Sequence, residues 1–250
     1  SILKITLNNP TQQNTLSLKF IDDLTNIFAN ADTNDAIKVI ILSSSGKVFS
    51  AGHNLKEIKS HREDKDQGLQ FFKTLINNCS DLMLKIINNS KPVIAEVNGI
   101  ATAAGCQLVA SCDLAYASQV SKFATPGVNI GLFCSTPMVA LSRVVKNKHS
   151  MEMLLTGDFI NADKAKSIGL INNYYDQNKL SDEVNLIAKK IATKSSLTLK
   201  IGKKAFYEQS EMSVVNAYKY ASEIMITNMM EADAEEGINA FIDKREPKWI

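Results

Sequence analysis

The apolar positions in the first hundred residues fall into three short runs rich in Ile, Val and Leu. These runs are ILKITL at 2–7, KVIILSS at 38–44 and KPVIAEV at 91–97. Each has the length and the β-branched content of a strand. Because longer segments of helical period separate them, the pattern predicts an α/β fold with a mainly parallel sheet and helical crossovers.

Amphipathic helices are predicted in both of the intervening segments. Residues 16–32 place one apolar face on the following side chains: Phe20, Leu24, Ile27 and Phe28. Ser17 stands where its hydroxyl can cap the first turn of that helix. Residues 67–89 have the same period and a broader apolar stripe. We therefore expect the chain to run strand, helix, strand, helix, strand.

The strand signal ends near residue 195. Three helical segments follow, at 195–209, 213–230 and 231–249. The pattern predicts a core over 1–194 and a helical region over 195–250. Since no Gly/Ser-rich or Pro-rich linker separates the two, we expect the helices to pack on the core or on a neighbouring subunit. Their apolar faces have no strand to cover, which favours an oligomer.

Composition narrows the classes of function. The 250 residues are 45% hydrophobic, and 28 basic against 26 acidic residues give a net charge of +2. This balance argues against a nucleic-acid-binding surface but allows a phosphorylated small ligand. No stretch has the roughly 18–20 uninterrupted apolar residues of a membrane span. We expect a cytoplasmic protein; because the sequence begins in a strand without Met, a trimmed targeting segment and a mitochondrial matrix location stay open.

Neither the cysteines nor one charged stretch indicates a metal-binding or catalytic role. Cys79, Cys106, Cys112 and Cys134 have no CxxC spacing and no clustered His. We therefore predict reduced core thiols and no metal site. The stretch KSHREDKDQG at 59–68 is polar, mixed in sign and weakly periodic. It is predicted to be a mobile surface loop.

Two stretches of small residues stand between a predicted strand and a predicted helix. VFSAGHN at 48–54 contains Ala51 and Gly52, and ATAAGCQ at 101–107 contains three small residues in succession. Close packing of a strand on a helix is one explanation. The other is that free N–H groups at two helix starts converge on one negatively charged oxygen, as in an oxyanion hole.

Several motifs in order resemble the enoyl-CoA hydratase/isomerase (crotonase) superfamily. They are FSAGHNLKE, KPVIAEVNGIATAAGCQLVASCDLAYAS, SKFATPGVNIGLFCSTP, MEMLLTGDFINADKAKSIGLINNYY and AFIDKREPKW, and they span almost the whole chain. The resemblance implies a spiral of β-β-α units with a C-terminal helical trimerisation region. It also implies a trimer or hexamer and an acyl-CoA ligand, with coenzyme A as part of the substrate and no separate cofactor.

The resemblance also assigns binding residues. The thioester carbonyl is expected between the backbone amides of His53 and Ala104, in turns that include Ala51, Gly52 and Gly105. Lys56 matches a region that holds the adenine and phosphates, although a solvated surface lysine is equally expected there. Contacts to the adenosine 3′-phosphate, often from a neighbouring subunit, are implied for three C-terminal residues: Phe241, Lys244 and Lys248.

The chain departs from the family's hydratases at two positions. Where they carry a pair of glutamates that position and activate water, this sequence has Gln107 and Gly127. A neutral amide exchanges no proton at pH 7 and glycine has no side chain, whereas a positioned acid or base contributes about 10²–10⁴ in rate. We therefore expect hydratase activity to be weak or absent, although Gln107 can still hold a water.

Few other groups can replace the two carboxylates. The His53 imidazole titrates near neutrality, but at a helix start it is expected to point outward and to lend only its amide. Cys106 lies beside Gln107 and is expected to be a packing residue. Structural or solvated positions are expected for Asp113, Glu57 and Glu152, and the acyl pocket can include Asn129, Ser135 and Thr136.

Two functions stay open. The first is an enzyme that acts on an acyl-CoA thioester through a stabilised enolate, with substituted acid and base groups. The second is a non-catalytic acyl-CoA-binding or assembly protein that keeps the fold and both amide turns. The absence of carboxylates at 107 and 127 favours the second for hydration specifically.

Overall fold

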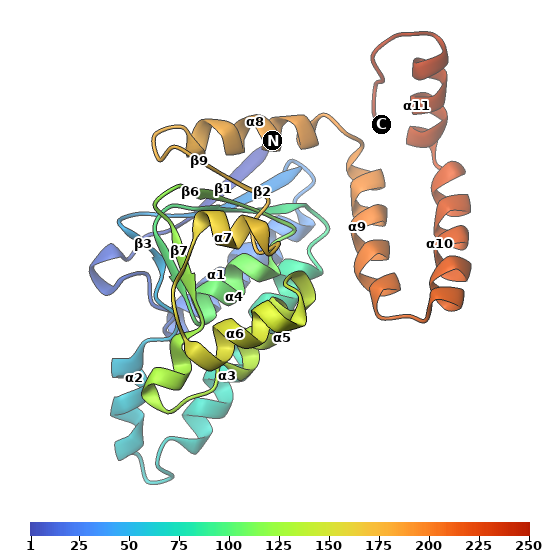
Figure 1. The fold of residues 1–250 in the computed structure, drawn as a ribbon. Coiled ribbons are helices and arrows are strands. Elements are labelled where there is room, and N and C mark those ends of the chain that lie inside the picture. The colour runs from blue at the N-terminus through green and yellow to red at the C-terminus, as the bar shows by residue number, and fades with distance from the viewer.

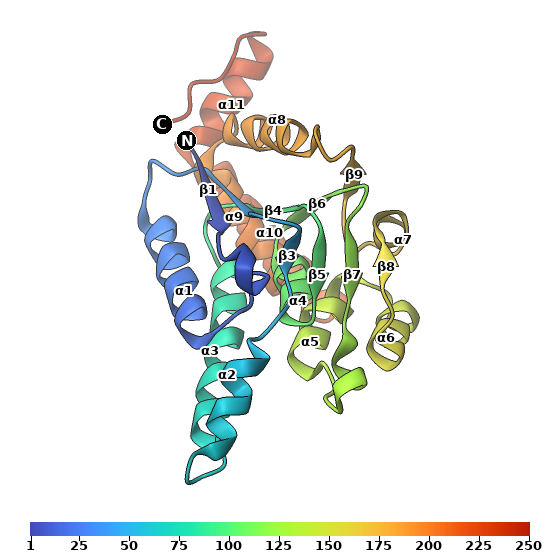
Figure 2. The same ribbon diagram turned by 90° about the vertical axis from the view of Figure 1, so that its left-hand side faces the viewer.

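The computed structural model describes residues 1–250 and contains two sheets (Figures 1 and 2). The five-stranded sheet has the order β1-β2-β4-β6-β9, and every neighbouring pair in it is parallel. Its strands are β1 (Ile2–Leu7), β2 (Val39–Ser44), β4 (Val93–Val97), β6 (Leu114–Ser118) and β9 (Asn173–Tyr175). The first three match the runs predicted from the sequence, so the expected parallel sheet is confirmed.

The four-stranded sheet is interleaved with the first along the chain. Its order is β3-β5-β7-β8, with only the last pair antiparallel. Its strands are β3 (Val48–Ser50), β5 (Ile100–Thr102), β7 (Lys122–Ala124) and β8 (Ile160–Asn161). Strands β2, β4 and β6 each continue into the neighbouring strand of this second sheet and then into a helix. The chain thus repeats a β-β-α unit, as the crotonase resemblance implied.

Eleven α-helices and three short 3₁₀ helices complete the chain. Up to residue 156 these are η1 (Pro10–Gln12), α1 (Leu18–Thr33), α2 (Leu55–Ser60), η2 (His61–Glu63), α3 (Leu69–Ile87), α4 (Ala104–Ser111), η3 (Pro126–Ile130), α5 (Ser135–Val144) and α6 (Asn147–Thr156). The later ones are α7 (Ala162–Ser167), α8 (Leu180–Ala192), α9 (Ser196–Ser210), α10 (Val214–Met229) and α11 (Ala232–Ile242). None combines the length and apolar content that crossing a bilayer requires.

The core lies on both faces of the five-stranded sheet. A cluster of 39 buried residues joins one face to helices that include α1, α3 and α4. Helix α8 covers the other face through Leu180, Val184 and Ala188, which pack on β2 and β4. Strands β2 and β4 are buried on both faces, which explains the continuous apolar runs in their sequences.

Helix α1 follows the predicted period with one shift. The Ser17 hydroxyl accepts a hydrogen bond from the Phe20 N–H at 3.2 Å, which confirms the expected cap. Leu24 and Phe28 are buried as predicted, but Ile27 is 40% exposed and Ile21 takes its place in the core. Helix α1 packs beside α3 (Figure 2), and Ile21, Leu24 and Phe28 all belong to the core cluster that covers the sheet.

The charged stretch at 59–68 is ordered into helix for much of its length, so the prediction of a loop was wrong there. Helix α2 runs to Ser60, and η2 follows directly. The His61 ring stacks on Phe71 with centroids 3.7 Å apart, and its Nδ1 lies 2.8 Å from Asp64 Oδ2. The low periodicity reflects two very short helices, which leave no room for a repeating stripe.

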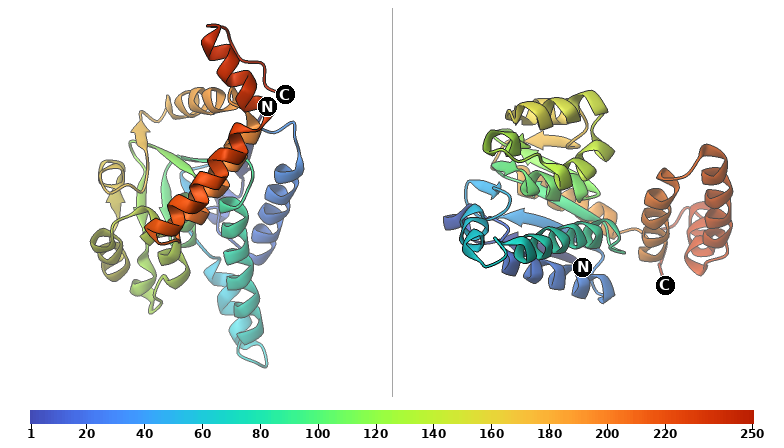
Figure 3. Two further views of the ribbon diagram at one scale, coloured as in Figure 1. Left: turned by 90° about the vertical axis from the view of Figure 1, so that its right-hand side faces the viewer. Right: turned by 90° about the horizontal axis from the view of Figure 1, so that it is seen from below.

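Helices α9, α10 and α11 form an arm that stands away from the rest of the chain (Figures 1 and 3). No residue of α9 or α10 is fully buried, and α11 buries only Asp233 and Ala240. We refer to residues 195–250 as the arm and to residues 1–194 as the core. The three helices occupy the segments in which the sequence predicted them.

Candidate functional site

The first small-residue turn joins β3 to α2. Gly52 has φ +84°, a conformation that favours glycine, and Asn54 caps the helix by accepting the N–H groups of Lys56 and Glu57. His53 stands between Gly52 and Asn54. The turn therefore places His53 directly before a helix N-terminus, where the helix dipole favours negative charge.

Hydrogen bonds on either side leave the His53 amide as a free donor. The Ala51 N–H donates to the Gln13 carbonyl at 3.1 Å, and the Asn54 N–H donates to the Leu16 carbonyl at 3.4 Å. The His53 N–H has no acceptor within the chain. It is thus free to donate to a ligand.

The second small-residue turn joins β5 to α4. Ala103 has φ +49°, unusual for a residue with a side chain, and its N–H donates to the Ala124 carbonyl at 3.0 Å. Ala104 is the first residue of α4, so no residue of that helix can accept its N–H. This strained residue comes directly before the start of α4.

The two turns are in contact. A Cβ atom added to Gly52 would lie 3.0 Å from the Ala103 Cβ and 3.3 Å from the Ala104 nitrogen. A Cβ atom on Gly105 would overlap the carbonyl oxygen of Ser50. Close packing thus accounts for the glycines, and the same packing brings the two helix starts together. The two explanations of the small residues are compatible.

Gln107 lies one turn into α4 and is 4% exposed. Its Oε1 is buried without a hydrogen-bond partner, although buried polar atoms are normally paired. Thr125, which follows the residue bonded to Ala103, is 1% exposed and also has an unpaired buried hydroxyl. Nothing in the sequence distinguishes Thr125 except its place directly before Pro126 and Gly127.

Gly127 lies in η3 and has no space for a side chain. Its φ is outside the left-handed region, yet an added Cβ would lie 2.5 Å from the Leu132 carbonyl oxygen and 2.9 Å from Cys134 Sγ. The loop after β7 has therefore closed around a glycine. A carboxylate at 127 would require the backbone of this loop to move.

The His53 ring does not point outward, contrary to the expectation from the sequence. Its Nδ1 lies 3.4 Å from the Leu16 carbonyl oxygen, and its Nε2 is buried without a partner. Burial lowers the pKa of His53 below its ordinary value of 6.5, and the Leu16 carbonyl opposes this shift only in part. The imidazole is thus neutral at pH 7, and Nδ1–H donates to Leu16.

The remaining candidate groups have structural environments. Burial raises the pKa of Cys106 to about 12, so its thiol stays protonated. All four cysteines are free and buried, as predicted. The Glu57 carboxylate accepts the Leu18 N–H at 3.2 Å at the start of α1, whereas Glu152 is exposed. These environments agree with the structural and solvated positions expected for the three residues.

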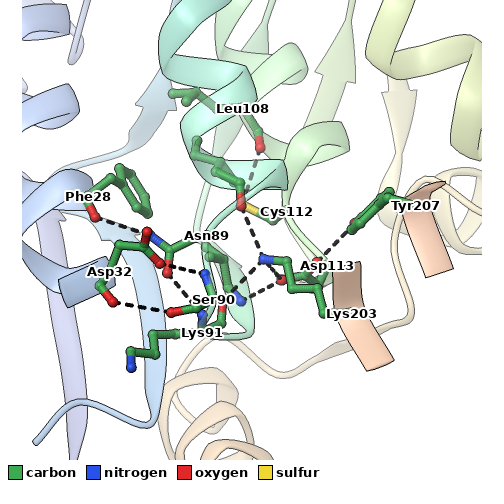
Figure 4. A network of polar contacts seen from close by, with 12 residues as sticks. Phe28, Asp32, Asn89, Ser90, Lys91, Leu108, Cys112, Asp113, Lys203 and Tyr207 are labelled. Carbon is green, nitrogen blue, oxygen red and sulfur yellow. Dashed lines mark hydrogen bonds and ion pairs between the residues drawn. The ribbon is translucent and has the colours of Figure 1, made fainter. Parts of the chain in front are cut away.

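Asp113 joins the arm to the core (Figure 4). One of its oxygens lies 2.7 Å from Lys203 Nζ, and the other accepts the Tyr207 hydroxyl at 2.9 Å. The Val93 N–H donates to the same carboxylate at 2.7 Å. This environment agrees with the structural role expected for Asp113.

The residues assigned to coenzyme A are not brought together within one chain. Lys56 is exposed on α2, while Phe241, Lys244 and Lys248 lie in or after α11. Figure 1 shows α2 and α11 at opposite ends of the molecule. Of the three residues expected to line the acyl pocket, Asn129 and Ser135 are exposed. A site that used both α2 and α11 would need a second copy of the chain.

Comparisons with known proteins agree with this fold. The family model "Enoyl-CoA hydratase/isomerase" matches residues 1–250. Human mitochondrial enoyl-CoA hydratase domain-containing protein 3 is 47% identical over 249 residues, covering 99% of this chain and 80% of that protein. Mitochondrial enoyl-CoA hydratase of Pongo abelii is 32% identical over 98% of this chain and 82% of its own length.

A solved structure is similar over the same extent. The crystal structure of human enoyl-CoA hydratase domain-containing protein 3 superposes with a TM-score of 0.94 at 46% identity. The match covers 99% of this chain and 96% of that chain.

Proposed function

Because this chain belongs to the enoyl-CoA hydratase/isomerase family, we propose that it binds an acyl-CoA thioester between the His53 and Ala104 amides. The observation that carries the proposal is the contact between the two turns, with Gly52 packed on Ala103 and Ala104. Two N–H groups at adjacent helix starts suit an oxygen that gains negative charge. The coenzyme A portion belongs to the substrate, and the site needs no other cofactor.

The reaction favoured by such a site passes through an enolate. Hydrogen bonds from both amides stabilise negative charge on the thioester oxygen, and each donor of this kind contributes about 10²–10³ in rate. Hydration also needs a group that activates water. Gln107 is neutral, Gly127 has no side chain and His53 is enclosed, so addition of water to an enoyl-CoA is expected to be slow.

The second candidate is a non-catalytic acyl-CoA-binding or assembly protein on the same fold. The closure of the loop around Gly127 favours it, because the position has no space even for a Cβ atom. Cys106 is buried and protonated, and the His53 ring is enclosed with its Nδ1 turned to the Leu16 carbonyl, so neither group favours a replacement for the carboxylates. The two candidates share the binding step and differ only in turnover.

The arm supports assembly of the chain into a homotrimer or homohexamer. An apolar groove of about 400 Å³ lies between its helices, lined by Met225, Met229, Ile238, Phe241 and Trp249 among others. Phe241 is 85% exposed and α9 and α10 bury no residue fully. A neighbouring copy would cover this surface and bring Phe241, Lys244 and Lys248 toward a site on another chain. Sedimentation as a monomer at micromolar concentration would contradict the assembly.

The family relatives also bear on the compartment. The human and Pongo abelii proteins are both named mitochondrial. We propose the mitochondrial matrix as the compartment of this chain, in place of the cytoplasm.

Binding of an acyl-CoA panel, with free coenzyme A as reference, tests the proposal. Ala104→Val puts a branched side chain beside the proposed thioester position and should abolish the preference for acyl-CoA. Ala110→Val is the matched control, because Ala110 is 7% exposed at the far end of the same helix. Equal binding of acyl-CoA by both variants would refute the proposed carbonyl site.

Turnover measured in parallel separates the two candidate functions. Loss of the enoyl absorbance at saturating crotonyl-CoA should be far slower than the roughly 1–10³ per second of ordinary enzymes. Turnover of any other acyl-CoA in the panel would favour the enzyme. Tight binding without turnover of any member would favour the binding protein.

A further inference from the structure

A segment that belongs to neither small-residue turn packs beside the first one; we call residues 13–16 the backing segment. Residues 13–16 run parallel to that turn, with a bridge between Leu16 and His53. Gln13 and Asn14 have φ of 55° and 50°, so this segment is fixed in a left-handed conformation that asparagine tolerates better than most residues. Asn14 is fully buried.

The backing segment forms hydrogen bonds with the backbone groups on either side of His53. The Leu16 N–H donates to the Gly52 carbonyl at 2.8 Å, and the Leu16 carbonyl accepts the Asn54 N–H at 3.4 Å. With the Ala51 N–H also paired, the His53 N–H alone is left to a ligand.

Ser50 is in contact with both turns. Its hydroxyl donates to the Asn14 carbonyl at 2.9 Å and accepts the Gly52 N–H at 3.3 Å. Its own carbonyl oxygen lies against Gly105, in the space that a Cβ atom there would occupy. A single fully buried serine therefore connects the backing segment, the first turn and the second turn.

The partner of this serine is itself fixed. The Asn14 side-chain Nδ2 donates to the carbonyls of Ser45 and Val48, at 3.0 and 2.7 Å, and its Oδ1 accepts the Asn9 N–H at 2.7 Å. Both polar atoms of the Asn14 side chain are thus hydrogen-bonded. The acceptor for the Ser50 hydroxyl cannot shift without breaking these bonds.

We infer that Ser50, held by Asn14, is a positioning residue that sets the separation and direction of the His53 and Ala104 N–H groups. The inference rests on the proposed function. Two donors stabilise one oxygen only if each lies about 2.7–3.1 Å from it. Loss of the Ser50 hydroxyl frees the Gly52 N–H and removes the link to Asn14, so the first turn can rotate relative to the second.

The test uses Ser50→Ala in the full chain with cinnamoyl-CoA as probe. Hydrogen bonds to the thioester oxygen shift the absorption of the conjugated acyl group to longer wavelength on binding. Ser43→Ala is the matched control, since Ser43 is a strand serine that is 3% exposed and donates to the Ile5 carbonyl at 3.2 Å. Both variants lose one buried hydroxyl, but only Ser50 touches the turns.

We expect Ser50→Ala to lose most of the red shift and about tenfold of the preference for cinnamoyl-CoA over free coenzyme A. The affinity for coenzyme A should stay within about twofold of the wild-type value, because Ser50 and Asn14 are not expected to contact that part of the ligand. Ser43→Ala should keep the wild-type shift and preference. Unfolding in urea, measured for both, shows whether the two substitutions cost similar stability.

The outcomes separate the inference from the function on which it rests. A folded Ser50→Ala variant with the wild-type red shift overturns the positioning role alone. A wild-type protein that does not distinguish cinnamoyl-CoA from coenzyme A overturns the proposed function, and the positioning role falls with it. Should Ser50→Ala not fold, Ser50→Cys keeps the volume with a weaker hydrogen-bonding group. It is expected to show an intermediate red shift, and an unchanged one would overturn the role.

Discussion

Helix α4 of the core and helices α9 and α10 of the arm differ in how completely their side chains are buried. Helix α4 buries all eight of its residues, while α9 and α10, at 15 and 16 residues, bury none completely. Apolar burial is the main stabilising term in folding. The arm therefore depends on contacts outside its own helices to a degree that the core does not.

The two regions also differ in how polar groups are used. In the core, polar side chains shape backbone turns, as Ser50 and Asn14 do beneath the amide donors. In the arm, they attach one region to the other: Lys203 of α9 reaches the core carbonyls of Ile86 and Lys91, both at 3.1 Å, and pairs with Asp113 (Figure 4). The junction is thus a small set of strong polar contacts beside a large exposed surface.

The largest loss of stability is expected from a substitution at this junction between the arm and the core. Lys203→Met leaves the Asp113 carboxylate without its cation, at side-chain exposures of 8% and 17% for the pair. Removing one partner of a buried pair costs about 3–5 kcal/mol. We expect a loss near that size in urea unfolding at fixed protomer concentration. Lys204→Met is the control, because Lys204 is 73% exposed and should change stability by less than about 0.5 kcal/mol. Equal losses would mean that the arm is not attached through Asp113.

A smaller loss is expected inside the core at Gly127. Gly127→Ala forces a Cβ atom against the Leu132 carbonyl and Cys134 Sγ, and overpacking of this kind costs about 1–3 kcal/mol. The double variant Gln107→Glu with Gly127→Glu should for the same reason fail to restore hydration of crotonyl-CoA. Calorimetric unfolding and the enoyl absorbance measure the two effects. Restored hydration in a stable double variant would show that the loop yields easily.

The pH dependence of stability tests the enclosed ring of His53. Burial holds its pKa in the folded chain below 6.5, so on acidification the unfolded chain binds the proton first. This contribution to stability is fully present above about pH 6.5 and is lost as the pH falls toward the folded-state pKa, at no more than about 1.4 kcal/mol per pH unit. His53→Gln should flatten the profile between pH 7.5 and 5.5 in urea titrations. An unchanged profile would place the ring in solvent.

The smallest expected change in stability is an increase, and it comes from a substitution in the arm. A Cβ atom on Gly202, inside α9, would meet nothing within 4 Å. Gly202→Ala should therefore raise stability by about 0.4–1 kcal/mol through helix propensity and reduced freedom of the unfolded chain. Thermal unfolding of the Gly202→Ala and Gly127→Ala variants, measured together, compares the two changes in stability. A loss of stability at 202 would indicate that a neighbouring copy packs closely on this face.

The sequence indicated the local elements well and their mutual contacts poorly. Strands at 2–7, 38–44 and 91–97 and the Ser17 cap could be predicted because each depends on residues near one another in the chain. The shift from Ile27 to Ile21 could not, since it depends on how α1 packs against distant parts of the chain such as α3. Short helices such as η2 give no periodic signal at all.

The same division holds for the candidate site. Both amide turns could be predicted from small residues between a strand and a helix, and the missing glutamates followed from the family resemblance. The orientation of the His53 ring could not be predicted, because it depends on the Leu16 carbonyl 37 positions earlier. The role of Ser50 could not be predicted for a similar reason, since its partner Asn14 lies 36 positions away.

The interleaved order of the two sheets has a consequence for the time course of folding. From β2 to β7, successive strands of the chain alternate between the two sheets, and some strand pairs that are neighbours in space, such as β6 and β9, lie far apart in sequence. Chains dominated by such non-local parallel pairing fold slowly. On a ribosome that adds about 5–20 residues per second, the edge of β6 stays unpaired until Asn173–Tyr175 has emerged. For those seconds the nascent chain presents an open parallel edge, and an unpaired edge of this kind is open to non-native pairing.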